Sequence, residues 1–83
     1  MKLVYFAWVR ERIGLTDEDV DLPPGVATVD DLLAWLKGRG PEYENALAEA
    51  SVIRVAVDHV HAQRTAVLAG ASEVALFPPM TGG

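Results

Sequence analysis

A continuous run of hydrophobic residues, residues 3–9, lies near the start of the sequence. The run is rich in β-branched and aromatic residues, which favour extended structure. Because neither of its alternating faces is polar throughout, the pattern predicts a central strand. We expect a short helical turn over residues 10–14, ended by Gly14, and then a weaker, acidic strand over residues 17–22.

A helical period replaces this pattern after Thr28. Apolar side chains recur at the i, i+3, i+4 and i+7 spacing of a buried stripe, at Val29, Leu32, Leu33 and Leu36. Thr28 is a favourable N-cap, and the carboxylates of Asp30 and Asp31 suit the positive end of the helix dipole. A second, shorter helix is expected to open at Gly40 and Pro41, with the proline in its first turn.

The second half of the sequence predicts strands separated by turns. Residues 52–57 and 73–77 are predicted as strands, residues 58–61 as a turn or strand edge, and residues 65–68 as a short fourth strand. Helices thus cluster between two pairs of strands. This order indicates an α+β domain, a mixed sheet of about four or five strands with helices packed on one face. It describes a β-grasp (ubiquitin-like) fold over residues 1–77, in which the last strand lies parallel beside the first.

The composition excludes several classes of protein. The chain has 83 residues, of which 51% are hydrophobic and 23% charged, so it suits one folded domain. Its net charge of −5 leaves no basic stripe for nucleic acid and favours a basic protein partner. Without cysteine, it can form neither a disulfide nor a thiolate metal site. The apolar run is too short to span a membrane, so we expect a cytoplasmic protein with no membrane partner.

The last residues, 78–83, form a tail that is not expected to adopt regular structure. The tail consists of Pro78, Pro79, Met80, Thr81, Gly82 and Gly83. Its prolines stiffen the base, and its glycine pair has no side chains, so the backbone could enter a narrow slot in another protein. Fully extended, the tail would span about 20 Å and could deliver the Gly83 carboxylate into a partner's active site. A disordered chain end without function is the alternative.

A C-terminal carboxylate at Gly83 would need chemical activation. Such a group has a pKa of about 3.5, so it is ionised at neutral pH and is a poor electrophile. Adenylation with ATP in a partner enzyme is the simplest activation. The acyl adenylate could then accept sulfur, which gives a thiocarboxylate, or an amine, which gives an amide.

The ending Phe-Pro-Pro-Met-Thr-Gly-Gly, residues 77–83, resembles the terminus of the molybdopterin synthase small-subunit family of sulfur carriers. Other segments similar to that family are residues 4–7, 22–23, 28–29, 39–41, 55–57 and 73–75. The resemblance covers essentially the whole chain. Asp58 is a departure, because the family often has asparagine at this point.

The resemblance implies a β-grasp fold and an E1-like enzyme that adenylates Gly83. It implies that the resulting thiocarboxylate donates sulfur to a pyranopterin precursor in the active site of the large subunit, during molybdenum cofactor biosynthesis. Two small subunits and a dimer of large subunits would form a heterotetramer. The chain itself would bind no cofactor, would use ATP only through its activating partner, and would turn nothing over alone.

Two other functions stay open at this point. The chain could be a sulfur carrier for another pathway, such as thiamine synthesis, cysteine synthesis or tRNA thiolation. It could also be a ubiquitin-like modifier or an interaction module without sulfur chemistry. The tail chemistry is common to the carriers, so the residues do not decide the acceptor.

An exposed aromatic patch beside the root of the tail is a candidate docking surface. Strict alternation along the first and last strands would put Phe6, Trp8 and Phe77 on the face away from the helices. Val60 and His61 are expected to border this patch. Exposed apolar patches mark protein interfaces, although Phe6 and Trp8 could equally be core residues.

Metal binding is not expected. His59 and His61 alternate and would share one face of a strand, but no third ligand is apparent in the sequence. The acidic residues of 17–21 do not have the spacing of an EF-hand loop. They are better explained as a charged edge strand that resists self-pairing.

Overall fold

A five-stranded mixed sheet forms one layer of the computed structural model, which describes residues 1–79. Its strands are β1 (Lys2–Tyr5), β2 (Asp17–Asp19), β3 (Arg54–Val57), β4 (Val60–His61) and β5 (Glu73–Phe77). They lie in the order β2-β1-β5-β3-β4, with β1 and β5 parallel and the other neighbours antiparallel. The last strand therefore lies beside the first, and the predicted β-grasp arrangement is confirmed.

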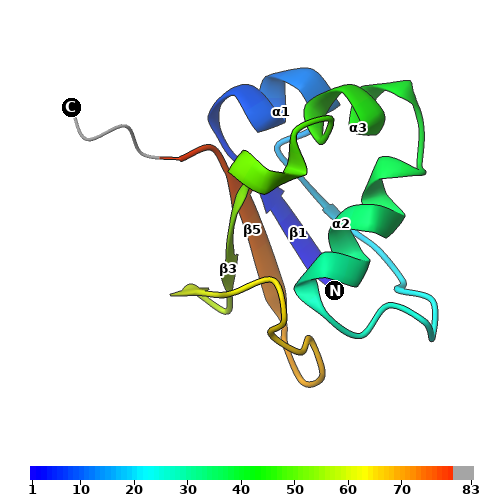
Figure 1. The fold of residues 1–83 in the computed structure, drawn as a ribbon, viewed down its shortest axis with the longest axis vertical. Helices are drawn as coiled ribbons and strands as arrows, with labels where there is room; N and C mark the ends of the chain where they lie inside the picture. The colour runs from blue at the N-terminus through cyan, green and yellow to red at the C-terminus, as the bar shows by residue number, and fades with distance from the viewer. Residues whose placement is uncertain (80–83) are drawn as a thin grey trace.

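The helices form a second layer against one face of this sheet (Figure 1). They are α1 (Ala7–Ile13), α2 (Val29–Lys37), α3 (Pro41–Ala46) and the 3-10 helix η1 (Ala50–Val52). The side chains that β1 and β5 point towards them are fully buried, at Leu3, Tyr5, Val74 and Leu76. Within residues 1–79, the opposite face of the sheet carries no helix. We call it the open face.

The first strand is shorter than predicted. β1 ends at Tyr5 and α1 begins at Ala7, so the prediction of a strand over residues 3–9 is wrong beyond Tyr5. The reason is the spacing of two apolar residues. Val9 and Ile13 lie four positions apart, so a helix presents both to the core, where they are buried.

The helix ends follow the predicted capping residues. Gly14 has a φ of 90°, and its N–H donates to the carbonyl of Arg10 at 2.8 Å, which ends α1. At the start of α2, the N–H of Asp31 donates to Oγ1 of Thr28 at 3.2 Å, and the N–H of Thr28 donates to Oδ2 of Asp31 at 3.1 Å. This reciprocal capping box satisfies two backbone donors. Pro41 stands in the first turn of α3, as expected.

Of three further strands that the sequence predicted, two are shorter than expected and one does not form. The strand predicted over residues 52–57 starts two residues late, because η1 occupies its beginning. The acidic strand expected over residues 17–22 ends at Asp19, although Val20 still exchanges hydrogen bonds with Met1. The strand expected over residues 65–68 is wrong, since an isolated bridge between Val67 and Thr28 lies there.

A tight turn joins β3 to β4 at Asp58 and His59. Both residues have positive φ angles, 47° and 69°, which is typical of a type I′ hairpin turn. Oδ1 of Asp58 accepts the backbone N–H groups of Ser72 and Glu73, each at 2.9 Å. The predicted turn is therefore confirmed, and it is tied to the start of β5.

The core lies between the sheet and the helices. The residues that are fully buried and largest are Tyr5, Leu3, Leu32, Leu36, Leu47, Leu76, Val9, Val29 and Val74. They come from every layer of the fold, so burial of apolar surface holds the helices on the sheet. None of the helices within residues 1–79 is long and apolar enough to cross a bilayer.

Candidate functional site

An apolar groove lies on the open face of the sheet, where β5 leads into the tail. Alternation along β5 buries Val74 and Leu76 under the helices and turns Ala75 and Phe77 to the opposite face. The groove has a volume of about 510 Å³. Its lining consists of Phe6, Ala7, Ala56, His59, Glu73, Ala75, Phe77, Pro78 and Pro79. We call this the tail-root groove.

The parallel pairing of β1 with β5 brings Phe6 to the tail-root groove. The N–H of Phe6 donates to the carbonyl of Leu76 at 3.1 Å, one residue beyond the end of β1. This bond extends the pairing with β5 by one residue beyond β1, to Phe6. The Phe6 side chain remains 47% exposed and adds its ring to the apolar lining of the groove.

Two alanines make the floor of the tail-root groove flat. Ala56 and Ala75 face one another across the β3–β5 pair, and both line the groove. Because their side chains are small, a partner's side chains can approach the sheet backbone closely. The aromatic rings of Phe6 and Phe77 then serve as walls, an arrangement suited to an apolar protein surface.

The structure brings three of the five predicted patch residues together. Phe6 and Phe77 line the tail-root groove, and the ring of His61 meets that of Phe77 edge-on, with centroids 5.5 Å apart. His61 and Phe77 come from β4 and β5, which lie on either side of β3. His61 therefore lies at the border of the aromatic patch, and its role in an interface stays a prediction.

Trp8 and Val60 lie elsewhere, and their expected positions were wrong. Trp8 is on α1 instead of a strand, and it lines a separate hollow, where the Arg12 guanidinium lies 4.5 Å from its ring centre. Val60 pairs with Val57, so it belongs to the face of the sheet opposite to that of His61. It is 68% exposed there, outside the lining of the tail-root groove.

The predicted tail divides at the limit of the described residues. Pro78 and Pro79 line the tail-root groove directly after β5. Met80, Thr81, Gly82 and Gly83 lie outside the described residues, so the role assigned to Gly83 stays a prediction. The chain therefore leaves the sheet through an apolar surface.

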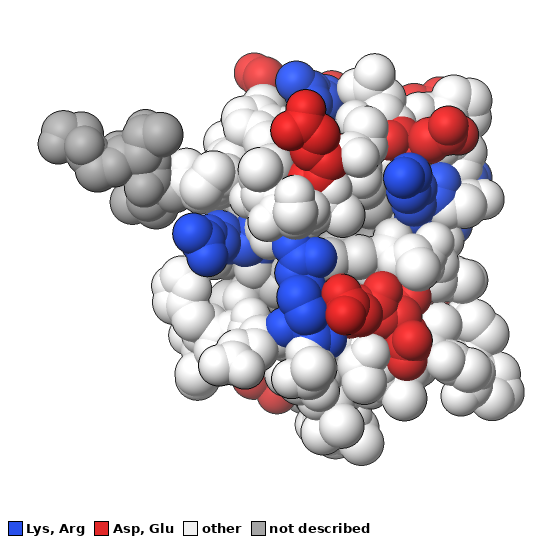
Figure 2. Space-filling model, viewed as in Figure 1, with Lys and Arg blue, Asp and Glu red and all other residues white. Residues whose placement is uncertain are grey.

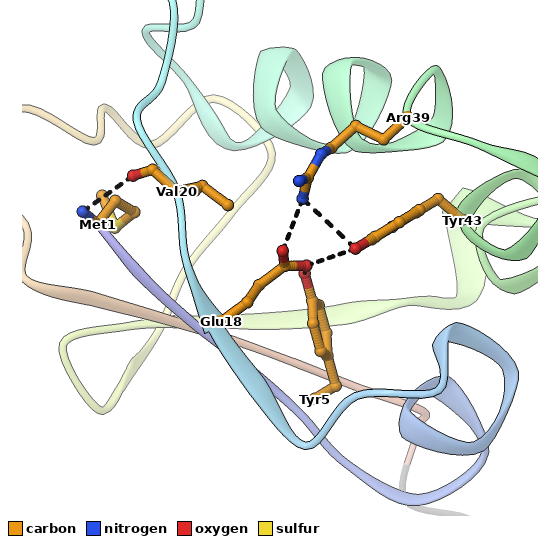
Figure 3. Close-up of polar contacts among 6 residues, drawn as sticks. All are labelled: Met1, Tyr5, Glu18, Val20, Arg39 and Tyr43. Atoms are coloured by element: carbon orange, nitrogen blue, oxygen red, sulfur yellow. Dashed lines mark hydrogen bonds and ion pairs between the residues drawn. The ribbon is translucent and has the colours of Figure 1, made fainter.

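A polar cluster that the sequence did not reveal joins the sheet edge to the helices (Figure 3). The carboxylate of Glu18 on β2 accepts three side-chain hydrogen bonds, from Tyr5 at 2.7 Å, Tyr43 at 2.7 Å and Arg39 at 2.9 Å. The Arg39 guanidinium also lies 5.1 Å from the centre of the Trp35 ring. These partners are 13 to 25 residues from Glu18 in sequence, so no local motif could have identified them.

The cluster is structural rather than reactive. Burial would raise the pKa of Glu18, but the hydrogen bonds from Tyr5, Tyr43 and Arg39 outweigh it and hold that pKa below its ordinary value. Burial, together with the bond to Glu18, raises the pKa of the Tyr5 hydroxyl, which therefore stays protonated. Glu18 thus remains an anion and Tyr5 a neutral donor, as a permanent tether requires. Within residues 1–79 no three potential ligands gather that could hold a metal ion.

Comparisons with known proteins cover the whole of the chain. The model of the ThiS family matches residues 3–83. The molybdopterin synthase sulfur carrier subunit of Chlamydomonas reinhardtii is 31% identical over 83 residues, covering 100% of this chain and 98% of that protein. The protein of the same name from Dictyostelium discoideum is 30% identical, covering 99% and 94%. The crystal structure of small archaeal modifier protein 1 from Haloferax volcanii matches with a TM-score of 0.73 and 30% identity, covering 96% and 97%.

Proposed function

The chain belongs to the ThiS family, and on that premise we propose that it is the sulfur carrier subunit of a molybdopterin synthase. The observation that carries the proposal is the reach of the family match, which extends through the glycine pair to residue 83. The relatives named as molybdopterin synthase sulfur carrier subunits from an alga and an amoeba support the choice of pathway.

The chemistry proposed for Gly83 has two steps on partner enzymes. In the first, a carboxylate oxygen of Gly83 attacks the α-phosphorus of ATP, and pyrophosphate leaves. In the second, a sulfur nucleophile at the oxidation level of hydrosulfide attacks the acyl carbon, and AMP leaves with the electron pair of the broken C–O bond. The product is a thiocarboxylate, whose sulfur then passes to the pyranopterin precursor.

The tail-root groove is the proposed docking surface for the partners. An E1-like activating enzyme and the large subunit of the synthase would each cover Phe6 and Phe77 while the tail enters the active site. Two small subunits on a dimer of large subunits give the proposed heterotetramer. The chain contributes no cofactor of its own, and ATP is consumed in the activating enzyme, in the cytoplasm.

Protein modification is the second candidate function. It is favoured by the likeness in fold and sequence to a small archaeal modifier protein, over nearly the full length of both chains. Adenylation of Gly83 would be the same, but a lysine amine of a target protein would then attack the acyl carbon and form an isopeptide bond. Sulfur carriers for other pathways share the adenylate and the thiocarboxylate, and differ only in the acceptor.

Intact mass spectrometry tests these functions. The full chain is incubated with the activating enzyme of its own organism, ATP and sulfide, beside a variant that lacks Gly83. The proposal expects replacement of one oxygen by one sulfur in the full chain, dependent on ATP, and no change in the truncated chain. Sulfur incorporation by the truncated chain would refute the role of Gly83. Isopeptide products in cells, without a thiocarboxylate, would favour the modifier instead.

A further inference from the structure

A second groove, with a volume of about 680 Å³, lies at the outer edge of β3 next to the root of the tail. Its polar lining consists of Ser51, Arg54, His61, Gln63 and Arg64. Apolar atoms of Ile53, Val55 and Ala62 complete the lining. We call this the β3-edge groove. Figure 2 shows basic side chains gathered beside the root of the tail.

The β3-edge groove exists because β4 is only two residues long. β4 pairs with Ala56 and Val57 only, so the outer edge of the first part of β3 has no neighbouring strand, while its other edge pairs with β5. The guanidinium of Arg64 takes the place of that strand. Its Nη2 donates to the carbonyl of Ile53 at 3.0 Å and also to the carbonyl of Ala50. Arg64 is therefore held in position as one wall of the groove.

The charge of the β3-edge groove is opposite to that of the molecule as a whole. The chain has 12 acidic against 7 basic residues, yet no acidic residue lines this groove. Arg64 has an exposed carboxylate nearby, with Nη1 3.7 Å from Oδ1 of Asp30. Arg54 is exposed and forms no ion pair with any carboxylate of residues 1–79. Its charge is thus available to a ligand.

The β3-edge groove is continuous with the tail-root groove. Arg54 lies directly opposite Phe77 in the β3–β5 register, and His61, which lines the β3-edge groove, touches the Phe77 ring. A partner that covers Phe77 and Pro78 must therefore also lie over Arg54. The two grooves together form one surface, apolar on one side and cationic on the other.

We propose that the β3-edge groove receives an acidic segment of the enzyme that activates the tail, with Arg54 as the main charge contact. The inference rests on the proposed function. A protein segment fits better than a small anion, because apolar atoms of Ile53, Val55 and Ala62 share the lining, and Arg54 is the one guanidinium of the groove that forms no ion pair with a carboxylate of residues 1–79. Elsewhere the net negative charge of the chain repels such a segment, so the groove also orients the partner.

The test compares Arg54→Glu and Arg54→Lys with Lys37→Glu, which makes the same charge change at the end of α2. ATP–pyrophosphate exchange by the activating enzyme is measured as a function of carrier concentration and salt. We expect Arg54→Glu to raise the KM for the carrier about tenfold, because a like charge would face the acidic segment, while kcat stays unchanged. Arg54→Lys should restore most of the affinity, and Lys37→Glu should match the wild type. Thermal unfolding of each variant verifies the fold.

The outcomes separate this inference from the proposed function. If the wild type supports ATP–pyrophosphate exchange and Arg54→Glu has the same KM as the wild type, the acidic-segment contact is overturned. The carrier function is then left intact. No exchange with the wild type would overturn both. As a second measurement, the wild type is titrated with inorganic phosphate and followed by NMR. Saturable shifts confined to Arg54, His61 and Gln63 would indicate a small-anion site and would also overturn the inference.

Discussion

The hydroxyl of Tyr5 donates a hydrogen bond of 2.7 Å to Oε2 of Glu18, across the pairing of β1 with β2. Tyr5 is fully buried, while Glu18 belongs to a three-residue strand at the edge of the sheet. The same carboxylate accepts bonds from Arg39, between α2 and α3, and from Tyr43 on α3, so one side chain connects the sheet edge to the helical layer. This carboxylate therefore adds side-chain bonds to the backbone pairing that holds the short edge strand on β1.

Glu18 should make the stability of the protein depend on pH in the acid range. Its pKa is lowered in the folded state, because the bonds from Tyr5, Tyr43 and Arg39 outweigh the effect of burial. Its contribution is therefore fully present above the pKa of an unfolded glutamate, about 4.3, and is lost as pH falls through the lower folded pKa. We expect wild type and Glu18→Gln to differ most in free energy of unfolding near neutral pH, and least near pH 3.

Urea unfolding of both proteins at a series of pH values between about 3 and 7 measures this difference. Asp19→Asn is the matched control, since it removes a carboxylate from an exposed position of the same strand. A gap between wild type and Glu18→Gln that stays constant down to pH 3 would contradict the assigned cause. At neutral pH we expect the gap to be about 1–3 kcal/mol, because Tyr5 loses its charged acceptor.

Ala7→Gly should stabilise the protein. Ala7 has a φ of 52°, in the left-handed region that costs an L-residue about 1–2 kcal/mol. Glycine removes this strain but has more freedom in the unfolded chain, so we expect a net gain of about 0.5–1 kcal/mol. Differential scanning calorimetry should show a higher Tm for Ala7→Gly. Ala7→Val is the opposing control and should lower it, because a β-branched residue tolerates this conformation poorly.

The capping of α2 and the bounds of β5 could be predicted because each depends on local pattern. Thr28 lies three residues before Asp31, and the apolar stripe after it has the helical period, so neighbouring residues alone define the helix. Residues 73–77 contain the β-branched Val74 and the aromatic Phe77, which favour a strand, and the two prolines that follow end it.

Features that depend on distant contacts could not be predicted. The run of residues 3–9 has high strand propensity throughout, yet it turns into α1 because the core offers a place for Val9 beside Ile13. Because the prediction continued the strand to residue 9, it also assigned Trp8 to the wrong surface. Glu18 looked like one more charge on an acidic edge, and its partner Tyr43 lies 25 residues away. Strand and helix propensities depend on the residue and its neighbours in sequence, whereas the start of α1 and the contacts of Glu18 depend on tertiary packing.

Asp58→Asn should leave stability nearly unchanged, whereas Asp58→Ala should lower it. Oδ1 of Asp58 accepts two backbone N–H groups at 2.9 Å, and the residue has a φ of 47°. Asparagine keeps an acceptor oxygen and tolerates the left-handed region. Alanine removes the acceptor from both donors, with an expected loss of about 1–2 kcal/mol in the free energy of unfolding. Equal losses for both variants in urea unfolding would show that the charge, rather than the hydrogen-bond geometry, holds this turn.

Phe6→Ser should weaken partner binding without weakening the fold. Phe6 is 47% exposed beside the tail root, and serine is a favourable N-cap for α1, which begins at the next residue. If Phe6 is an aromatic anchor of the proposed interface, the Kd for the synthase large subunit should rise about tenfold or more by calorimetric titration. Val67→Ser is the control, because Val67 is 67% exposed but lies outside the tail-root groove. Equal Kd values for both variants and the wild type would remove Phe6 from the interface.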